Sequence, residues 1–571
     1  MKDYKQLIAE IIAPNVEGLE AAEIKEWIEV PADAKMGDYA FPCFKLAKTL
    51  RKAPPLIAKG IADAISESEI FEKVEQVNAY VNMFMSKETF VKEVVKEVLE
   101  KGDEFGRSNV GENRPVIVEF SSPNIAKPFH IGHIRSTVIG NALYHIYDAM
   151  GYNVTRINHL GDYGTQFGKM IVAYRLWGNE EDVRNNPIKT LVGYYTKFHV
   201  EAEKNPELDE EARRTFAKLE QGGEEETKLW QWFREESLKE FTRVYKMLGI
   251  EYDSYAGESF YSDKMPAIVQ ELKEKNLLVE SNGAEIVDLE PFGLTPAPIL
   301  KSDGSTLYIT RDIACAKYRK QTYDFYKNIY VVASQQNLHF QQLKKIIDLM
   351  GYEWSKDIIH VPFGLVSLED GVISTRQGRV VYLEEVLTRA IDETREIIKE
   401  KGVNTDNIED TARKVGIGAV VFNELSNNRI KDYVFSWKQV LDFNGETGPY
   451  VQYTYARCAS IVRNAGDCAE KLNFEKDFDA SFATGEAAYD LAKLLYKLPQ
   501  VVIDAGERYE PSVVTRHVVD IAQAFNRFYH DEHILVDNEK EKMSKLCLVI
   551  AAKNAIKNGL ALLGIEAPER M

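Results

Sequence analysis

The chain has 571 residues, a mixed composition typical of globular proteins and a net charge of −18 at pH 7. At roughly 150 residues per domain, this length predicts three or four domains. We expect no transmembrane helix because no stretch approaches about 18 consecutive apolar residues, and "MKDYKQLIAE" at the start lacks the pattern of a signal peptide. The negative charge argues weakly against unspecific nucleic-acid binding, but a specific RNA partner can still meet local basic surfaces.

Cysteine usage points to a reducing compartment. The five cysteines are scattered along the chain and form no Cys-x-x-Cys pair: Cys43, Cys315, Cys458, Cys468 and Cys547. This spacing argues against a disulfide framework and against a thiolate zinc site. We therefore expect a cytoplasmic protein without zinc.

The first predicted domain covers residues 1–108. It opens with helical periodicity, continues through the turn residues of "VPADAKMGDYAFPC", and then shows two helical stretches divided by Pro54-Pro55. The polar, glycine-rich segment 102–114 predicts a linker.

The second predicted domain, residues 109–445, alternates strands and helices. Strand, helix and strand follow one another within about 45 residues, which indicates a βαβ unit of a parallel sheet. The same alternation returns farther along, so we expect one parallel sheet interrupted by an insertion of about 180–300. The predicted strands are 115–120, 152–158, 328–334 and 358–366, and the predicted helices are 132–151 and 338–351.

Beyond residue 380 the pattern is largely helical. A glycine-rich joint at 441–457 precedes the last predicted domain, 446–571, which we expect to be all helical.

The segment "EFSSPNIAKPFHIGHIRST" (119–137) lies where a predicted strand ends and a helix begins. Ligands of open α/β sheets bind at this carboxyl edge, and the N-terminus of a helix suits phosphate. Gly132 allows close approach to the backbone, and His130 and His133 can donate hydrogen bonds to phosphate oxygens. Two histidines at this spacing also fit a metal site or a purely structural role. The strand–loop–helix context, with Lys127 just upstream and Pro128 stiffening the approach, favours phosphate.

This "HIGH" segment resembles the first signature of class I aminoacyl-tRNA synthetases. Further segments are similar to the arginyl-tRNA synthetase family in the same order along the whole chain: "GDYAFPCFKLAK", "NHLGDYGTQFG", "YITRDIACAKYR", "GETGPYVQYTYAR" and "GLALLGIEAPERM". The resemblance implies a multidomain α/β protein with a Rossmann-like parallel-sheet catalytic domain. It also implies an α+β N-terminal domain that meets the tRNA elbow and an all-helical C-terminal domain that binds the anticodon.

The activity implied by the resemblance is that of an arginine–tRNA ligase in protein biosynthesis. Arginine and ATP, carried with Mg²⁺, would give arginyl-AMP and pyrophosphate, and arginine would then pass to the 3′ end of tRNA(Arg). The nucleophile is already a carboxylate anion, so the reaction needs positioning and charge stabilisation rather than an activating base. A monomer is the family expectation.

For arginine, the resemblance implies a site made of Glu119, Ser121, Asn124, Tyr308, Asp312 and Gln336. Asp312 and Tyr308 are four residues apart and share a face if their segment is helical, so we expect them to meet the guanidinium. Asn124 and Gln336 would hold the amino-acid end, and Glu119 would serve either end. The alternatives are that Asp312 and Thr310 cap a helix and that Glu119 pairs with a nearby arginine.

For ATP, the second signature of the class, a lysine-rich "KMSKS" loop, corresponds to "VISTR" at 372–376. Both lysines are missing there, and Thr375 stands in the place of the second one; Ser374 remains, and Arg376 and Arg379 keep positive charge nearby. The resemblance implies that Lys127 supplies the missing charge. The expected ATP site therefore consists of Lys127, His130, Gly132, His133, Ser374, Thr375 and Arg376.

A second "KMSK" occurs at 542–545, and we interpret it as a coincidence. It lies 29 residues before the last residue and opens a helical pattern after the candidate cap residues Asp537 and Asn538. In the same domain, Phe525, Phe528 and Tyr529 could stack on unpaired bases, but their spacing favours a core role.

Two other functions fit parts of the pattern. Another class I synthetase would share the HIGH segment, although the acid-bearing site argues against apolar amino acids. An inactive relative that only binds tRNA would explain the missing lysines but not the intact HIGH segment and Lys127.

Overall fold

The computed structural model describes residues 1–302, 304–368, 381–400, 402 and 407–571. The chain folds into two compact units, and each contains segments that are distant in sequence. The first unit comprises residues 1–105, 454–499 and 517–558, and the second comprises 106–453, 500–516 and 559–571. The long C-terminal helices thus contribute residues to both units.

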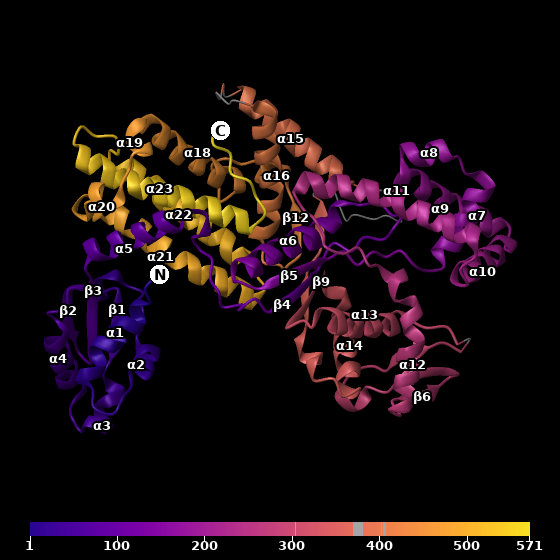
Figure 1. The fold of residues 1–571 in the computed structure, drawn as a ribbon, viewed down its shortest axis with the longest axis horizontal. Coiled ribbons are helices and arrows are strands. Elements are labelled where there is room, and N and C mark those ends of the chain that lie inside the picture. Colours follow the sequence, from indigo (N-terminus) through magenta and orange to yellow (C-terminus); the bar gives the residue numbers. More distant parts are fainter. Residues whose placement is uncertain (303, 369–380, 401, 403–406) are drawn as a thin grey trace. The chain divides into compact units, whose positions relative to one another are not determined.

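The N-terminal part of the first unit is a small α+β layer, as the sequence predicted. Its antiparallel sheet has the order β1-β3-β2, and α4 packs on β2 and β3 (Figure 1). Helix α4 begins at Pro54, where a missing backbone N–H is harmless, and buries Ile57, Ile61 and Ile65 at helical spacing. The elements are α1 (Tyr4–Ile12), α2 (Ala21–Trp27), β1 (Tyr39–Pro42), α3 (Ala47–Leu50), α4 (Pro54–Ile65), β2 (Phe71–Val77), β3 (Tyr80–Met85) and α5 (Lys87–Lys101).

The C-terminal part of the chain is helical. Its helices are α18 (Gly448–Ala465), α19 (Asp467–Glu470), α20 (Phe474–Asp477), α21 (Glu486–Arg508), α22 (Ser512–Asp531) and α23 (Glu539–Leu562). Phe525 and Phe528 are fully buried, which confirms the core interpretation for both, whereas Tyr529 is partly exposed. Helix α18 starts inside the predicted joint 441–457, so that joint is shorter than expected. Pro449, the second residue of the helix, lies in the turn where proline is tolerated.

The "KMSK" at 542–545 is part of α23. Asn538 caps this helix, since its Oδ1 accepts hydrogen bonds from the backbone N–H groups of residues 540 and 541. Ser544 is buried and accepts a 2.8 Å hydrogen bond from the backbone N–H of Asp479. Lys545 is buried too, between Glu532 and Glu541. The segment is therefore a structural part of the first unit, as predicted.

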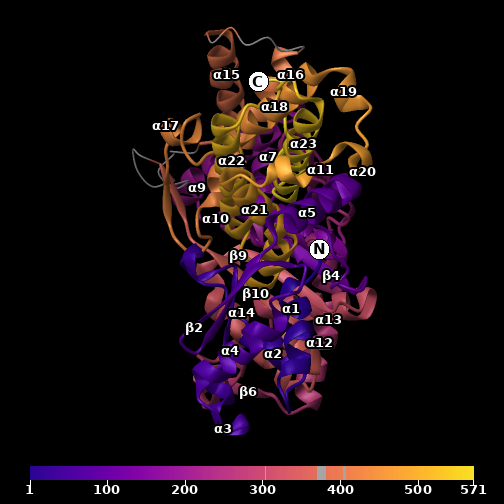
Figure 2. The same cartoon turned by 90° about the vertical axis from the view of Figure 1, so that its left-hand side faces the viewer.

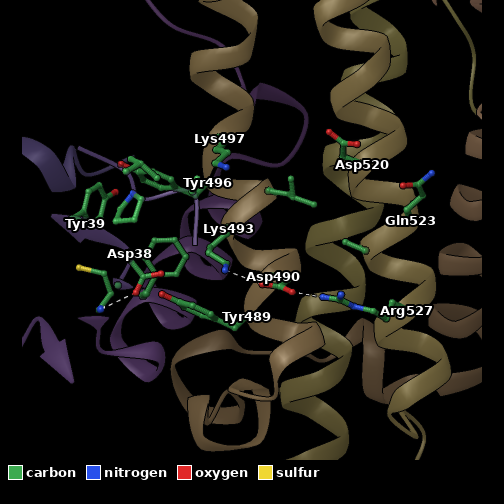
Figure 3. A pocket seen from close by; sticks show the side chains of 18 residues that line it. Asp38, Tyr39, Tyr489, Asp490, Lys493, Tyr496, Lys497, Asp520, Gln523 and Arg527 are labelled. Atoms are coloured by element: carbon green, nitrogen blue, oxygen red, sulfur yellow. Dashed lines mark hydrogen bonds and ion pairs between the residues drawn. The ribbon is translucent and has the colours of Figure 1, made fainter. Parts of the chain in front are cut away.

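A cavity of about 640 Å³ lies within the first unit, between the N-terminal layer and α21 and α22 (Figure 3). Aromatic rings line one side, including those of Tyr39 and Tyr496. On the other side Asp490 is paired with both Lys493 and Arg527. The cavity thus has an aromatic wall on one side and, on the other, a wall whose Asp490 is neutralised by Lys493 and Arg527.

The second unit is built on a parallel four-stranded sheet of order β10-β9-β4-β5. The strands are β4 (Pro115–Glu119), β5 (Asn153–Ile157), β9 (Lys327–Ala333) and β10 (Ile358–Phe363), and the helices beside them are α6 (Ile134–Ala149) and α14 (Asn337–Leu349). All six elements were predicted from sequence. The chain leaves β4 toward β5 on one side, while β9 lies on the other, so the strand order reverses between β4 and β9.

Two insertions and a helical pair complete the second unit. A helical cluster follows β5 and is seen at the right of Figure 1: α7 (Gln166–Trp177), α8 (Glu180–Asn185), α9 (Pro187–Lys204), α10 (Glu207–Glu220) and α11 (Glu224–Leu248). A smaller part follows, with α12 (Met265–Glu274), β6 (Leu278–Ser281), β7 (Ala284–Val287), β8 (Ala297–Leu300) and α13 (Tyr308–Tyr323).

After the sheet come β11 (Val366–Leu368), α15 (Leu383–Glu400), α16 (Ile408–Ser426), β12 (Tyr433–Phe435) and α17 (Trp437–Val440). Helices α15 and α16 stand side by side in Figures 1 and 2. Strands β11 and β12 pair in parallel, which the sequence did not predict. Within the described residues, no helix is both long and apolar enough to span a membrane.

Candidate active site

The loop that follows β4 is held in a strained conformation. Ser121, Ser122 and Ala126 all have positive φ, at 68°, 46° and 55°, a region that residues other than glycine rarely adopt. Backbone hydrogen bonds join this loop to the segment after β5: Gly161 donates to Pro123 and its carbonyl accepts from Ile125, both at 3.1 Å. The loop is therefore fixed in position at the carboxyl edge of the sheet, beside the reversal of strand order.

His130 and His133 lie at the start of the helix that follows this loop. His130 precedes a short 3-10 turn, Ile131–His133, which leads into α6. The His130 Nδ1 accepts a 3.0 Å hydrogen bond from the backbone N–H of Gly132. In a neutral ring this places the proton on Nε2, which is then free to donate to a ligand. The two imidazole centroids are 4.2 Å apart.

Both imidazoles are held in the neutral form. Burial lowers the pKa of His130. The pKa of His133 is lowered to about 3, mainly because the ring is buried and secondly because His130 lies beside it; the charge of Lys127 contributes to the same shift. A Cβ at Gly132 would lie 2.8 Å from the His130 ring, so any larger residue would displace that ring. These histidines are therefore suited to donate hydrogen bonds without adding a fixed charge.

Lys127 is exposed at the entrance to this segment. Among the described residues, no acidic side chain forms an ion pair with its amine in this structure. Asn124 is exposed three residues earlier and faces Gly161, where a Cβ would lie 2.3 Å from its Oδ1. Both side chains can therefore reach a ligand at the edge of the sheet.

The residues expected to meet the guanidinium lie on α13. The helix is present, so Tyr308 and Asp312 do share a face, with Tyr308 63% exposed. Asp312 Oδ2 lies 2.6 Å from Nε2 of His339, on the first turn of α14. Burial lowers the pKa of His339, but the hydrogen bond and charge of Asp312 outweigh it, and the pKa is raised overall. Gln336 is exposed directly before α14, three residues from His339.

Glu119, the last residue of β4, already has a partner. Its Oε2 lies 2.6 Å from Nη1 of Arg319, and both side chains are buried. The alternative that Glu119 pairs with a nearby arginine thus describes this structure, and its contact with a substrate stays a prediction. The charges of Glu119 and Asp312 both act on the half-buried His159, so they share one neighbourhood.

Ser121 is buried and contacts protein on two sides. Its Oγ is 2.8 Å from the hydroxyl of Tyr245, on α11, and accepts a 2.9 Å hydrogen bond from Thr137. Asn158 also donates to the Tyr245 hydroxyl, at 3.0 Å. Ser121 therefore ties the loop after β4 to the helical insertion, and contact of its side chain with a substrate stays a prediction.

Three residues of this neighbourhood were missed by the sequence reasoning: Arg319, His339 and Tyr245. Arg319 and His339 lie inside or beside segments that were singled out, so their charge and proximity were available signals. Tyr245 lies 124 residues from Ser121 and carries no local signal.

Ser374, Thr375 and Arg376 lie outside the described residues. The segment that follows them is hydrogen-bonded to the HIGH segment: Ile131 donates to the carbonyl of Val381, and Leu383 donates to the carbonyl of Phe129, both at 3.0 Å. Among the described residues, no group of three His, Cys, Asp or Glu side chains is arranged to hold a metal ion.

Comparisons with known proteins match the chain along its length. The family profile described as "tRNA synthetases class I (R), catalytic domain" matches residues 94–437. The profile described as "Arginyl tRNA synthetase N terminal domain" matches residues 2–85, and the "DALR anticodon binding domain" matches residues 451–571.

Relatives and solved structures agree with these profiles. The arginine–tRNA ligases of Halothermothrix orenii and Clostridioides difficile are each 56% identical to this chain over 571 residues, covering 100% of both chains. The arginyl-tRNA synthetase structure of Thermus thermophilus has a TM-score of 0.79 at 26% identity, covering 99% of this chain and 100% of that one. The one from Plasmodium falciparum, at 24% identity and a TM-score of 0.78, supports the same fold. The chain belongs to the arginyl-tRNA synthetase family of class I aminoacyl-tRNA synthetases.

Proposed function

We infer that this chain is an arginine–tRNA ligase. It activates arginine with ATP to arginyl-AMP and pyrophosphate and transfers arginine to the 3′ end of its tRNA. The observation that carries this inference is the likeness at 56% identity to arginine–tRNA ligases over the full length, with the HIGH segment placed at the reversal of strand order. Such a crevice is where open α/β sheets bind nucleotides.

The proposed ATP site is the HIGH segment with Lys127. The Nε2–H of His130 and the ring of His133 would donate to phosphate oxygens, and the amine of Lys127 would offset the charge that develops on them. Since both rings are neutral, Lys127 is the cation of this cluster. Preorganised donors of this kind act on the transition state without further reorganisation. Ser374, Thr375 and Arg376 are proposed to complete the site from the other side.

The proposed arginine site lies between the end of β4 and the facing ends of α13 and α14. Asp312 and Tyr308 would receive the guanidinium, because a carboxylate matches its planar fork. Asn124 and Gln336 would hold the amino-acid end. Glu119 and Ser121 would act at the floor, where Arg319 and Tyr245 already hold them in place.

The finer assignments are proposals as well. ATP would enter as its Mg²⁺ complex, the tRNA would be tRNA(Arg), and the enzyme would work as a monomer in the cytoplasm. The proposed domains are 1–108 at the tRNA elbow, 109–445 for catalysis and 446–571 at the anticodon.

ATP–pyrophosphate exchange tests the proposal directly. The purified chain is assayed with each of the twenty amino acids, with and without tRNA(Arg). Arginine alone should support exchange. Exchange with another amino acid would assign a different class I synthetase, and no exchange in any combination would favour an inactive tRNA-binding relative.

A further inference from the structure

A fully buried ion pair lies directly behind the HIGH segment. Arg135, two residues after His133, is completely inaccessible, and so is the side chain of Glu424, on α16. The Nε of Arg135 donates to Glu424 Oε1 at 2.6 Å, and its Nη1 donates to the carbonyl of Lys431 at 2.8 Å. The planar guanidinium thus makes two directed bonds that fix its position relative to α16 and the chain that follows it.

The same pair extends to β12. The hydroxyl of Tyr433, the first residue of β12, donates to the second oxygen of Glu424 at 2.5 Å, and the Arg135 guanidinium lies 5.2 Å from the centre of the Tyr433 ring. Tyr433 is the register partner of Val366, and its backbone N–H donates to the carbonyl of Leu365 at 3.1 Å. The position of β11 is therefore linked to α6 through Tyr433, Glu424 and Arg135.

Strand β11 ends at Leu368, directly before residues 369–380, and Val381–Leu383 come directly after them. The far side is bonded to the HIGH segment itself, through the pairs Ile131–Val381 and Phe129–Leu383. Both flanks of this stretch are thus attached to the HIGH segment or to α6, the helix that follows it. The flank at 381–383 is attached by backbone hydrogen bonds. The flank at β11 is attached through the side-chain contacts of Arg135, Glu424 and Tyr433.

Stability alone is a weak reason for such a pair. Removing two charges from water costs free energy that their attraction barely offsets, and apolar residues of similar size are often as stable. Burial raises the pKa of Glu424, while the charge of Arg135 and the hydrogen bonds of Tyr433 and Arg135 oppose the shift. What the pair supplies is a fixed position: one oxygen of Glu424 accepts from Arg135 and the other accepts from Tyr433, so the carboxylate joins α6 to β12.

We propose that Arg135 is a positioning residue for ATP, which acts through Glu424 and Tyr433 to hold β11 in register with the HIGH histidines. This inference rests on the proposed function, in which HIGH and 372–376 meet the same nucleotide. A shift of about 1 Å between two such groups can cost on the order of a hundredfold in rate. The proposed arginine site, formed by the end of β4, the loop after it and the facing ends of α13 and α14, contains none of the three residues, so arginine binding should be unaffected.

The first test compares two tyrosine-to-phenylalanine variants. Tyr433→Phe removes the bond to Glu424 but keeps the ring. Tyr147→Phe is the matched control, since Tyr147 is also buried in the second unit and its hydroxyl donates to the carbonyl of Gly506 at 3.1 Å, away from β11. In ATP–pyrophosphate exchange we expect Tyr433→Phe to raise the KM for ATP about tenfold, within the range of a hydrogen bond to a charged group. The KM for arginine should stay within about twofold.

A second pair of variants separates the charge of the ion pair from its geometry. Arg135→Lys keeps the charge but not the fork, and Glu424→Gln keeps the shape but not the charge. Both should lower kcat/KM for ATP more than Tyr433→Phe does, with Tm values and tRNA binding recorded alongside.

The outcomes separate the possibilities. If Tyr433→Phe and Tyr147→Phe change Tm and both KM values equally, the ion pair is only structural and the inference is wrong. It is also wrong if Arg135→Lys folds and leaves the KM for ATP unchanged. A wild-type chain without arginine-dependent exchange would overturn the proposed function instead, which is a different result.

Discussion

Replacing Lys127 by alanine should reduce arginine activation far more than any other single lysine change. The amine is exposed, and among the described residues no carboxylate pairs with it in this structure, so its charge is available to a bound nucleotide. At about 4 Å from a phosphate oxygen, with an effective dielectric constant of about 20, a unit charge contributes roughly 4 kcal/mol. Solvent screening reduces this figure, and we expect a loss of about a hundredfold in kcat, near 2.7 kcal/mol.

The assay is ATP–pyrophosphate exchange with saturating arginine and tRNA. Lys127→Arg serves as the charge control and should retain most of the activity. Lys542→Ala serves as the motif control, because Lys542 is paired with Glu539 at 2.6 Å on α23, in the other unit. Its expected change is within about twofold. Equal and small effects of Lys127→Ala and Lys542→Ala would refute the reasoning, and so would a Lys127→Arg variant as weak as the alanine variant.

Three further outcomes follow from single contacts. Asp312→Ala should reduce arginine-dependent exchange by at least about a hundredfold while Tm and the circular dichroism spectrum stay unchanged, since its carboxylate is the proposed partner of the guanidinium; retained activity would contradict that assignment. The KM for arginine should depend on pH through the His339–Asp312 pair. When the guanidinium of arginine binds Asp312, the raised pKa of His339 would return toward its usual 6.5, so binding releases a proton. The KM for arginine should therefore fall as pH rises through that raised pKa. His339→Gln should flatten this dependence, and a profile identical to wild type would exclude it. Ser544→Ala leaves the backbone N–H of Asp479 without its partner and should lower the free energy of unfolding by about 1–3 kcal/mol, with exchange activity unchanged; lost activity with unchanged stability would contradict the structural role of this segment.

The parallel sheet was predictable because β4 and β9 are short apolar runs, each followed by a helix, α6 or α14, that leads toward another strand. Strand β4 is buried from Val116 to Glu119 and was predicted as 115–120 against an observed end at Glu119. The loop after it was placed correctly at the carboxyl edge, since that position follows from strand order alone. Helix α18 was harder, because glycine and proline at its first two positions look like a joint when the sequence is taken by itself.

The contacts that connect distant segments could not be predicted. Arg135 lies in a segment that was singled out, but its partner Glu424 is 289 residues farther along. Strand β12 has only three residues, and it forms because Tyr433 lies beside Leu365. No local sequence pattern predicts that contact. Periodicity and motif spacing describe neighbours along the chain, whereas these bonds depend on which helix faces α6 after the sheet has formed.

The absence of both lysines from 372–376, the stretch proposed as the second signature, fits the same geometry. The segment that follows this stretch returns to the HIGH segment, where Val381 and Leu383 bond to residues 131 and 129. Lys127 is two residues before Phe129, at the same edge. In the proposed ATP site, where HIGH and 372–376 meet one nucleotide, a cation at 127 and a cation within 372–376 would be alternative sources of charge for the same phosphates. Because a charge acts through distance rather than through its place in the sequence, Lys127 beside HIGH would make lysines in the loop dispensable under this proposal.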